Sequence, residues 1–313
     1  MSGIFFLGTT GSLLNIILFS RRKLRQTSCC IYFLAASFSS LLSLLFGLIP
    51  TFYLLNNVYP GNYSVVFCKM QSYVTHTSLQ MTRAFLALAC FDRYTLSLGN
   101  TYLQRFATVT VACRCIPIVI LSCYLIAIHL VIYLDVVNSS CGIRYAPALI
   151  YNSVYSITTI SVTLPLFMFT FSLLTLMNLK RRQKQRQQMN TGLIHRDIIR
   201  DRKVFFTLSV QLILYFISTA LYAPNIIYTT ITQNMPKSSD QQAIGVFINR
   251  IALLLIYIYP GLSFSAFTLS SGTFRRELIN LWRSLPIHCV RGATVTPHTT
   301  TNRRTLNLTN NQT

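Results

Sequence analysis

Seven long apolar runs dominate this sequence, and they limit what it can fold into. They cover residues 4–20, 29–55, 65–98, 106–134, 148–179, 204–231 and 243–271. As helices, runs of this length can cross about 30 Å of hydrocarbon. The chain is 52 % hydrophobic and only 11 % charged, too apolar for one soluble core. The sequence therefore predicts an all-α integral membrane protein, a seven-transmembrane helix bundle with its two ends on opposite sides.

The net charge of +21 is distributed unevenly between the loops. Basic residues gather at 21–25, 180–203 and 275–304, after the first, fifth and seventh runs, whereas the alternate loops contain few. By the positive-inside rule, the N-terminus is expected to be extracellular and the C-terminus cytoplasmic, in a multi-pass protein of the plasma membrane. No aromatic residues are interleaved with this charge, so we expect contact with membrane lipids and no nucleic acid binding.

Two cysteines and two sequons fall on the side expected to be extracellular. Cys68 begins the third run and Cys141 lies in the loop after the fourth, so both face oxidising conditions and can form a disulfide. Asn62 and Asn138 begin Asn-x-Ser sequons in the same two loops. Both asparagines are therefore candidate glycosylation sites.

An amphipathic stretch follows the seventh run. Phe274, Leu278 and Trp282 recur at helical spacing, with arginines between them, which predicts a short helix along the cytoplasmic membrane surface. Cys289 comes next, and it is either a palmitoylation site or a free thiol.

The chain divides into two parts of unequal length. Residues 1–285 are expected to form the membrane domain, and residues 286–313 a disordered cytoplasmic tail. The tail is rich in threonine, and residues 299–301 form its densest cluster of candidate phosphorylation sites.

A charged tripeptide, Asp92-Arg93-Tyr94, ends the third run. Arg93 lies 25 residues after Cys68, which along a helix corresponds to about one bilayer thickness. Only six residues of the whole chain are acidic, so an aspartate beside an arginine at a helix end requires an explanation.

In its seven runs, their orientation, the Cys68 and Cys141 pair, and Asp92-Arg93-Tyr94, the chain resembles a rhodopsin-like (class A) G-protein-coupled receptor, of the type that binds peptides. The resemblance implies that Arg93 turns toward a heterotrimeric G protein on activation, while Asp92 holds it in the resting state. It also implies a receptor kinase and arrestin as partners, and it makes the helix from Phe274 the family's short cytoplasmic eighth helix.

The sixth run carries a second part of the resemblance. Leu221-Tyr222-Ala223-Pro224 is similar to the family's Cys-Trp-x-Pro motif. The resemblance places Tyr222 at the position of the tryptophan switch and leaves Pro224 to kink the helix.

The sequence also departs from the family pattern. The Asn-Pro-x-x-Tyr motif of the seventh helix should fall at residues 263–267, which read Ser-Phe-Ser-Ala-Phe, and no acidic residue precedes Asp92. Two functions therefore stay open. The first is a receptor that binds an extracellular ligand and activates a G protein. The second is a non-signalling seven-helix scaffold or decoy that has lost coupling.

Polar residues in the outer halves of the runs are the candidate ligand contacts. They are Thr75, His76, Gln80, Asn152, Asn225, Asn249 and Arg250. Thr75 stands where amine receptors of the family carry an aspartate, so a monoamine ligand lacks its counter-ion here. The set suits a neuropeptide, a carboxylate or another anion. For Arg250 the alternative is a cation that extends to the outer interface.

Arg83 lies deep in the third run, ten residues before Arg93. A charge at this depth costs at least roughly 2.5–3.5 kcal/mol, so Arg83 needs water or acceptors inside the bundle. Its role is either structural or part of the switch.

The residues for catalysis or metal binding are missing from the sequence. His76 and His129 have no partners at metal-ligand spacing. The chain contains no P-loop, zinc-protease or serine-hydrolase motif. We therefore expect no metal, no cofactor and no enzymatic activity.

Overall fold

The computed structural model describes residues 2–53, 60–137, 140–187, 195–232, 235 and 238–284. The first part of this fold consists of helices. They are α1 (Ser2–Phe19), α2 (Ser28–Tyr53), the 3₁₀ turn η1 (Pro60–Asn62), α3 (Val65–Ser97), α4 (Thr101–Gln104), α5 (Val109–Ile126) and α6 (His129–Tyr133).

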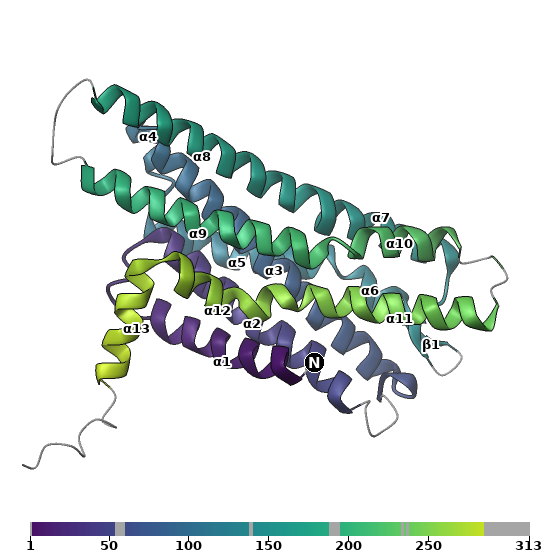
Figure 1. Ribbon diagram of the computed structural model, residues 1–313. Coiled ribbons are helices and arrows are strands. Elements are labelled where there is room, and N and C mark those ends of the chain that lie inside the picture. The colour runs from purple at the N-terminus through teal and green to yellow at the C-terminus, as the bar shows by residue number, and fades with distance from the viewer. Residues whose placement is uncertain are drawn as a thin grey trace, which may run out of the picture.

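The second part begins with a hairpin of two short strands and continues in helices. Its elements are β1 (Leu134–Val137), β2 (Ser140–Ile143), α7 (Ala146–Ser156), the π-helix η2 (Ile157–Thr163), α8 (Leu164–Gln187), α9 (His195–Thr219), α10 (Tyr222–Ile231), α11 (Ser239–Ile256), α12 (Ile258–Ser270) and α13 (Gly272–Ser284). Strands β1 and β2 are at one end of the bundle and α13 is at the other (Figure 1), and we call these the hairpin end and the α13 end.

Five helical stretches are long and apolar enough to cross a membrane by length and composition. They are Ser28–Pro50, Val109–Tyr133, Ala146–Arg182, Phe205–Ile231 and Ser239–Ser270. The helix Gly3–Phe19 is apolar but shorter, and α3 is not among the five. The described residues are thus all-α apart from one hairpin, and their fold is compatible with a multi-pass membrane protein.

The surfaces that face away from the bundle are apolar. On α5, for example, Ile118, Leu121 and Leu125 are all exposed. On α9 and α11, Ile217 and Phe247 are exposed in the same way. Water would disfavour such continuous apolar faces, whereas lipid tails solvate them.

Helix α3 lies inside the bundle and contacts α2, α5, α8 and α9. Its interior positions include the charged side chains of Arg83, Asp92 and Arg93, each less than a tenth exposed. The other helices therefore separate the polar side of α3 from the surroundings.

Three of the long helical rods are interrupted next to a proline. Because Pro165 has no N–H to donate, the turn before it widens into η2. Pro224 and Pro260 each sit in the first turn of a new helix, and the breaks before them fall at residues 220–221 and at Tyr257. The sequence predicted the kink at Pro224.

Helices α1 and α12 approach closely because glycines face the contact. A Cβ atom on Gly8 would lie 3.0 Å from the backbone of Gly261 and 2.8 Å from Leu44. A Cβ atom on Gly11 would lie 2.8 Å from the side chain of Phe264. These contacts leave no space for a side chain on this face of α1.

We expect Gly8→Ala to destabilise the protein by roughly 1–3 kcal/mol, because the new methyl group forces α1 away from α12. Gly3→Ala is the matched control, since nothing lies within 4 Å of a Cβ atom there. The thermal unfolding midpoint of the purified protein in detergent would measure both. Equal midpoints for the two variants would contradict the proposed close packing.

Candidate functional site

At the hairpin end, a disulfide ties α3 to the hairpin. Cys68, in the first turn of α3, is bonded to Cys141 of β2, with their Cα atoms 5.7 Å apart. This is the pair that the sequence predicted. Cys141 lies opposite Val136 in the antiparallel register, and the buried Cys68 packs against Leu130 and Leu134.

The predicted glycosylation residues lie near this disulfide in the chain. Asn62 ends the short turn η1 and is partly exposed. Asn138 lies between the two strands, outside the described residues. The strands themselves were not predicted, although the valines before Asn138 and the asparagine are typical of a strand followed by a turn.

Removing this disulfide with Cys141→Ser should lower the free energy of unfolding by about 2–4 kcal/mol, because the bridge closes a long loop in the unfolded chain. The matched control is Cys113→Ser, a free and exposed cysteine of α5. Thermal unfolding with and without a reductant would test this. A wild-type midpoint that does not respond to the reductant would argue against the bridge.

At the other end of α3, Asp92 and Arg93 form a buried ion pair. The Nε and Nη2 atoms of Arg93 donate to Oδ2 of Asp92 over 3.0 and 2.5 Å. Among the described residues, Oδ1 of Asp92 has no hydrogen-bond partner. The ring of Tyr94 packs against Phe171 of α8, 5.2 Å away between centroids. The tripeptide is thus held inside the bundle.

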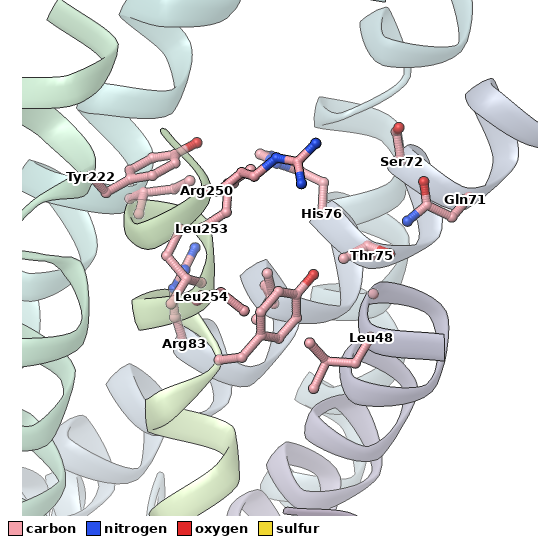
Figure 2. A pocket seen from close by; sticks show the side chains of 15 residues that line it. Leu48, Gln71, Ser72, Thr75, His76, Arg83, Tyr222, Arg250, Leu253 and Leu254 are labelled. Atoms are coloured by element: carbon pink, nitrogen blue, oxygen red, sulfur yellow. The ribbon is translucent and has the colours of Figure 1, made fainter. Parts of the chain in front are cut away.

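A cavity of about 410 Å³ lies between α2, α3, α10 and α11. Figure 2 shows the side chains that line it. Its size is that of a small-molecule site. Three candidate ligand residues line it, namely Thr75, His76 and Arg250, together with Arg83 and the predicted switch residue Tyr222.

All three helix interruptions contribute to this cavity. The cavity is lined by Ile160 of η2, by Tyr222 after the break between α9 and α10, and by Tyr257 at the break between α11 and α12. Irregular backbone at membrane depth is tolerated where it borders a cavity. The widened turn η2 also leaves the carbonyl of Ile160 free to accept a hydrogen bond from the hydroxyl of Tyr215.

Arg83 is 3 % exposed and lines the cavity at the end further from the hairpin. One Nη atom donates to Oε1 of Gln80 over 3.4 Å, and the guanidinium lies 5.5 Å from the ring centre of Tyr215. Within the described part of the chain, no carboxylate forms an ion pair with it. Its acceptors are therefore neutral ones.

Arg250 and Thr75 line the cavity but differ in exposure and in hydrogen bonding. Arg250 is exposed, and its guanidinium extends across the cavity toward His76 (Figure 2). Thr75 is 8 % exposed, and its hydroxyl has no hydrogen-bond partner among the described residues. The ring of His76 contacts the hydroxyl of Tyr155 at 3.3 Å.

Four candidate ligand residues do not line this cavity. Gln80 accepts from Arg83, and the oxygen of Asn152 contacts Nε2 of His129 at 3.2 Å. Asn225 donates to Asn249 over 2.8 Å. The structure pairs them with protein groups instead of presenting them to the cavity, which residue type alone did not indicate.

Other residues of the cavity were not predicted from the sequence. Gln71 and Ser72 line it, and they share a face of α3 with Thr75, so helical spacing could have identified them. Tyr257 could not be found in this way, because it depends on the break before Pro260. Pro224 itself is exposed and lies outside the lining.

The predicted helix after the seventh run is present as α13. Phe274 is buried, with ring centroid distances of 5.4 Å to Phe19 and 5.9 Å to Phe267. Trp282, two turns further along α13, is 66 % exposed. Cys289 and the tail 286–313 lie outside the described residues.

A buried carboxylate that the sequence did not single out also holds α13 in place. Glu277 is 5 % exposed; its Oε1 contacts Nζ of Lys23 at 2.8 Å, and its Oε2 contacts Nη1 of Arg21 at 3.4 Å. The hydrogen bond from Lys23, reinforced by both positive charges, lowers the pKa of Glu277 below its ordinary value of 4.5. The pairing is therefore complete near neutral pH.

Glu277→Gln should weaken the docking of α13 by about 1 kcal/mol, since the partner cations are partly exposed. Because the pKa of the folded state is lowered, the contribution is present above about pH 4.5 and is lost as the pH falls through the lowered pKa. Fluorescence of Trp282, the single tryptophan of the chain, reports on α13. Arg276→Gln is the neighbouring control. If an added quencher reduces the fluorescence of Trp282 equally in both variants, the ion pairs of Glu277 are contradicted.

In the comparisons with known proteins, no family model matches this chain and no curated protein matches it. The functional argument therefore depends on the geometry of the cavity and of α3.

Proposed function

We propose that this protein is a plasma membrane receptor that binds an extracellular ligand and activates a heterotrimeric G protein. The observation that carries the proposal is the arrangement along α3. The disulfide of Cys68 lies at one end, the cavity beside Thr75 and Arg83 comes next, and the buried Asp92–Arg93 pair lies at the other end. Such an arrangement suits a helix that connects ligand binding to a switch.

Seven membrane crossings follow if α1 and α3 are added to the five apolar stretches. Helix α3 has 33 residues, about 50 Å at 1.5 Å per residue, which is more than enough to cross. Its polar residues do not prevent this, because they face other helices. The positive-inside rule then places the hairpin end outside and α13, as the eighth helix, in the cytoplasm.

In this proposal the helix breaks transmit the signal. A ligand in the cavity would contact Tyr222 and Tyr257, which are at the two breaks, and Arg83, which packs on Tyr215 of α9. A shift of α9 against α3 would then expose Arg93 to the G protein. The absence of a carboxylate from the described lining favours a peptide or another non-amine ligand.

The alternative is a seven-helix scaffold or decoy that does not signal. One observation favours it. Phe267, where the family has a tyrosine, packs in an aromatic cluster with Phe33 and Phe19 at centroid distances of 4.8 and 5.2 Å. A phenylalanine offers no hydroxyl group for a polar relay at this position.

Asp92→Asn separates the two functions without a known ligand. Replacing the carboxylate removes a charge-assisted pairing worth roughly 1.5–3 kcal/mol, enough to shift a resting equilibrium at least tenfold. We expect basal G-protein activation to rise in cells, at matched surface expression, and to be abolished again in the Asp92→Asn, Arg93→Ala double variant.

Asp135→Asn is the matched control, because Asp135 is a half-exposed carboxylate of the hairpin that lies 4.0 Å from Arg144. Its basal activity should equal that of the wild type. If Asp92→Asn stays silent with every Gα class, and a screen of amidated and acidic peptides also gives no response, the scaffold function is favoured.

A further inference from the structure

The cavity has a positive charge that the described protein does not compensate. The two guanidinium groups of Arg83 and Arg250 line it, and none of the described residues of its lining is acidic. A buried guanidinium loses most of its hydration, and only partners of opposite charge or several acceptors offset that loss. Among the described residues, Arg83 contacts one side-chain acceptor, Gln80, and one aromatic ring, that of Tyr215.

Within the described part of the chain, no carboxylate lines the cavity. Three are paired within the described structure: Asp92 with Arg93, Asp135 with Arg144, and Glu277 with Arg21 and Lys23. Asp240 is in the first turn of α11, and Asp197 and Asp201 are near the start of α9, at the α13 end. An external anion is therefore the available partner for Arg83.

The face of α3 that lines the cavity limits the length and the polarity pattern of an anion that can bind there. Thr75, Leu79 and Arg83 follow one another at four-residue spacing, so they form one stripe about 12 Å long. Arg83 is at the inner end, Leu79 is in the middle, and the unpartnered hydroxyl of Thr75 is at the outer end. Opposite this stripe, Leu253 and Leu254 of α11 add apolar wall.

We propose that the cavity binds a ligand with a terminal carboxylate on an apolar body, and that Arg83 holds the carboxylate while Arg250 attracts it at the mouth. The inference rests on the receptor function proposed above and specifies its ligand class. The guanidinium fork of Arg83 can bind a carboxylate through two parallel hydrogen bonds. The hydroxyl of Thr75 then meets a polar group at the other end of the ligand.

Two sources offer this chemistry, a free organic acid and the C-terminal carboxylate of a peptide. At about 3.3–3.6 Å per extended residue, three to four residues of a peptide would span the 12 Å stripe. Amidation of the C-terminus removes the charge from either source and leaves the shape nearly unchanged. Acid and amide pairs therefore test the charge alone.

The experiment measures binding to the full-length protein, purified in lipid nanodiscs without a G protein. The probes are 4-phenylbutyrate against 4-phenylbutyramide, and acetyl-Phe-Leu-Leu with a free against an amidated C-terminus. We expect at least one acid to bind tenfold or more tightly than its amide, measured by the ligand-dependent shift of the unfolding midpoint. The pair that shows this ratio identifies the source.

Three variants test whether Arg83 and Arg250 cause the preference for the acid over its amide. Arg83→Gln should reduce the acid-to-amide ratio to about one and leave the unfolding midpoint of the free protein unchanged or higher. Arg250→Gln, at an exposed position where folding is not at risk, should weaken acid binding at least threefold and leave amide binding unchanged. Arg114→Gln, an exposed arginine of α5 that does not line the cavity, should keep the full ratio.

The proposal is overturned if both acids bind no better than their amides, or if the ratio survives both Arg83→Gln and Arg250→Gln. A lower midpoint for Arg83→Gln with an unchanged ratio would make Arg83 a structural residue, which also overturns it. The nanodisc assay contains no G protein, so it tests the ligand class independently of signalling. If the acid binds in nanodiscs but produces no signal in cells, the receptor function is contradicted and the ligand class stands.

Discussion

Charge on a helix inside an apolar bundle is the constraint on which the rest of this structure depends. Helix α3 carries Arg83, Asp92 and Arg93, and a charge in hydrocarbon is costly unless a partner or water stabilises it. Asp92 and Arg93 neutralise each other within one turn. The surrounding helices, with their apolar outer faces, separate all three residues from the surroundings of the bundle. The polar interior and the apolar exterior are thus two consequences of the same physical requirement.

Among the described residues, Arg83 has neutral partners in place of a carboxylate, and its charge therefore faces the cavity. Its contacts with Gln80 and Tyr215 stabilise a cation less well than a carboxylate would. The cavity beside it is also the place where three prolines interrupt the neighbouring rods. Each interruption sets the direction of the helix that follows it, and so decides which side chains reach the cavity. An anionic ligand there would contact both Arg83, which no carboxylate of the described residues pairs, and the residues at the helix interruptions.

Prediction from the sequence succeeded where one local rule was sufficient. Helical periodicity gave the amphipathic α13, and helix length with side-of-membrane reasoning gave the Cys68–Cys141 disulfide. It failed where the outcome depended on which neighbour a side chain meets. Asn152 and Asn225 looked like ligand contacts by residue type, yet His129 and Asn249 engage them. The sequence did not predict a role for Glu277, because its partners lie more than 250 residues away in the chain.

The sequence by itself determined the helical, membrane-compatible class of this protein, because apolar runs of sufficient length leave the backbone few other solutions in lipid. It also determined that Asp92 and Arg93 are adjacent, since neighbours in the chain remain neighbours in any fold. Only the tertiary structure decided that η2, α10 and α11 border the same cavity as Arg83. That arrangement depends on how bent rods pack against α3, and packing between distant segments is set by the shape of the whole bundle.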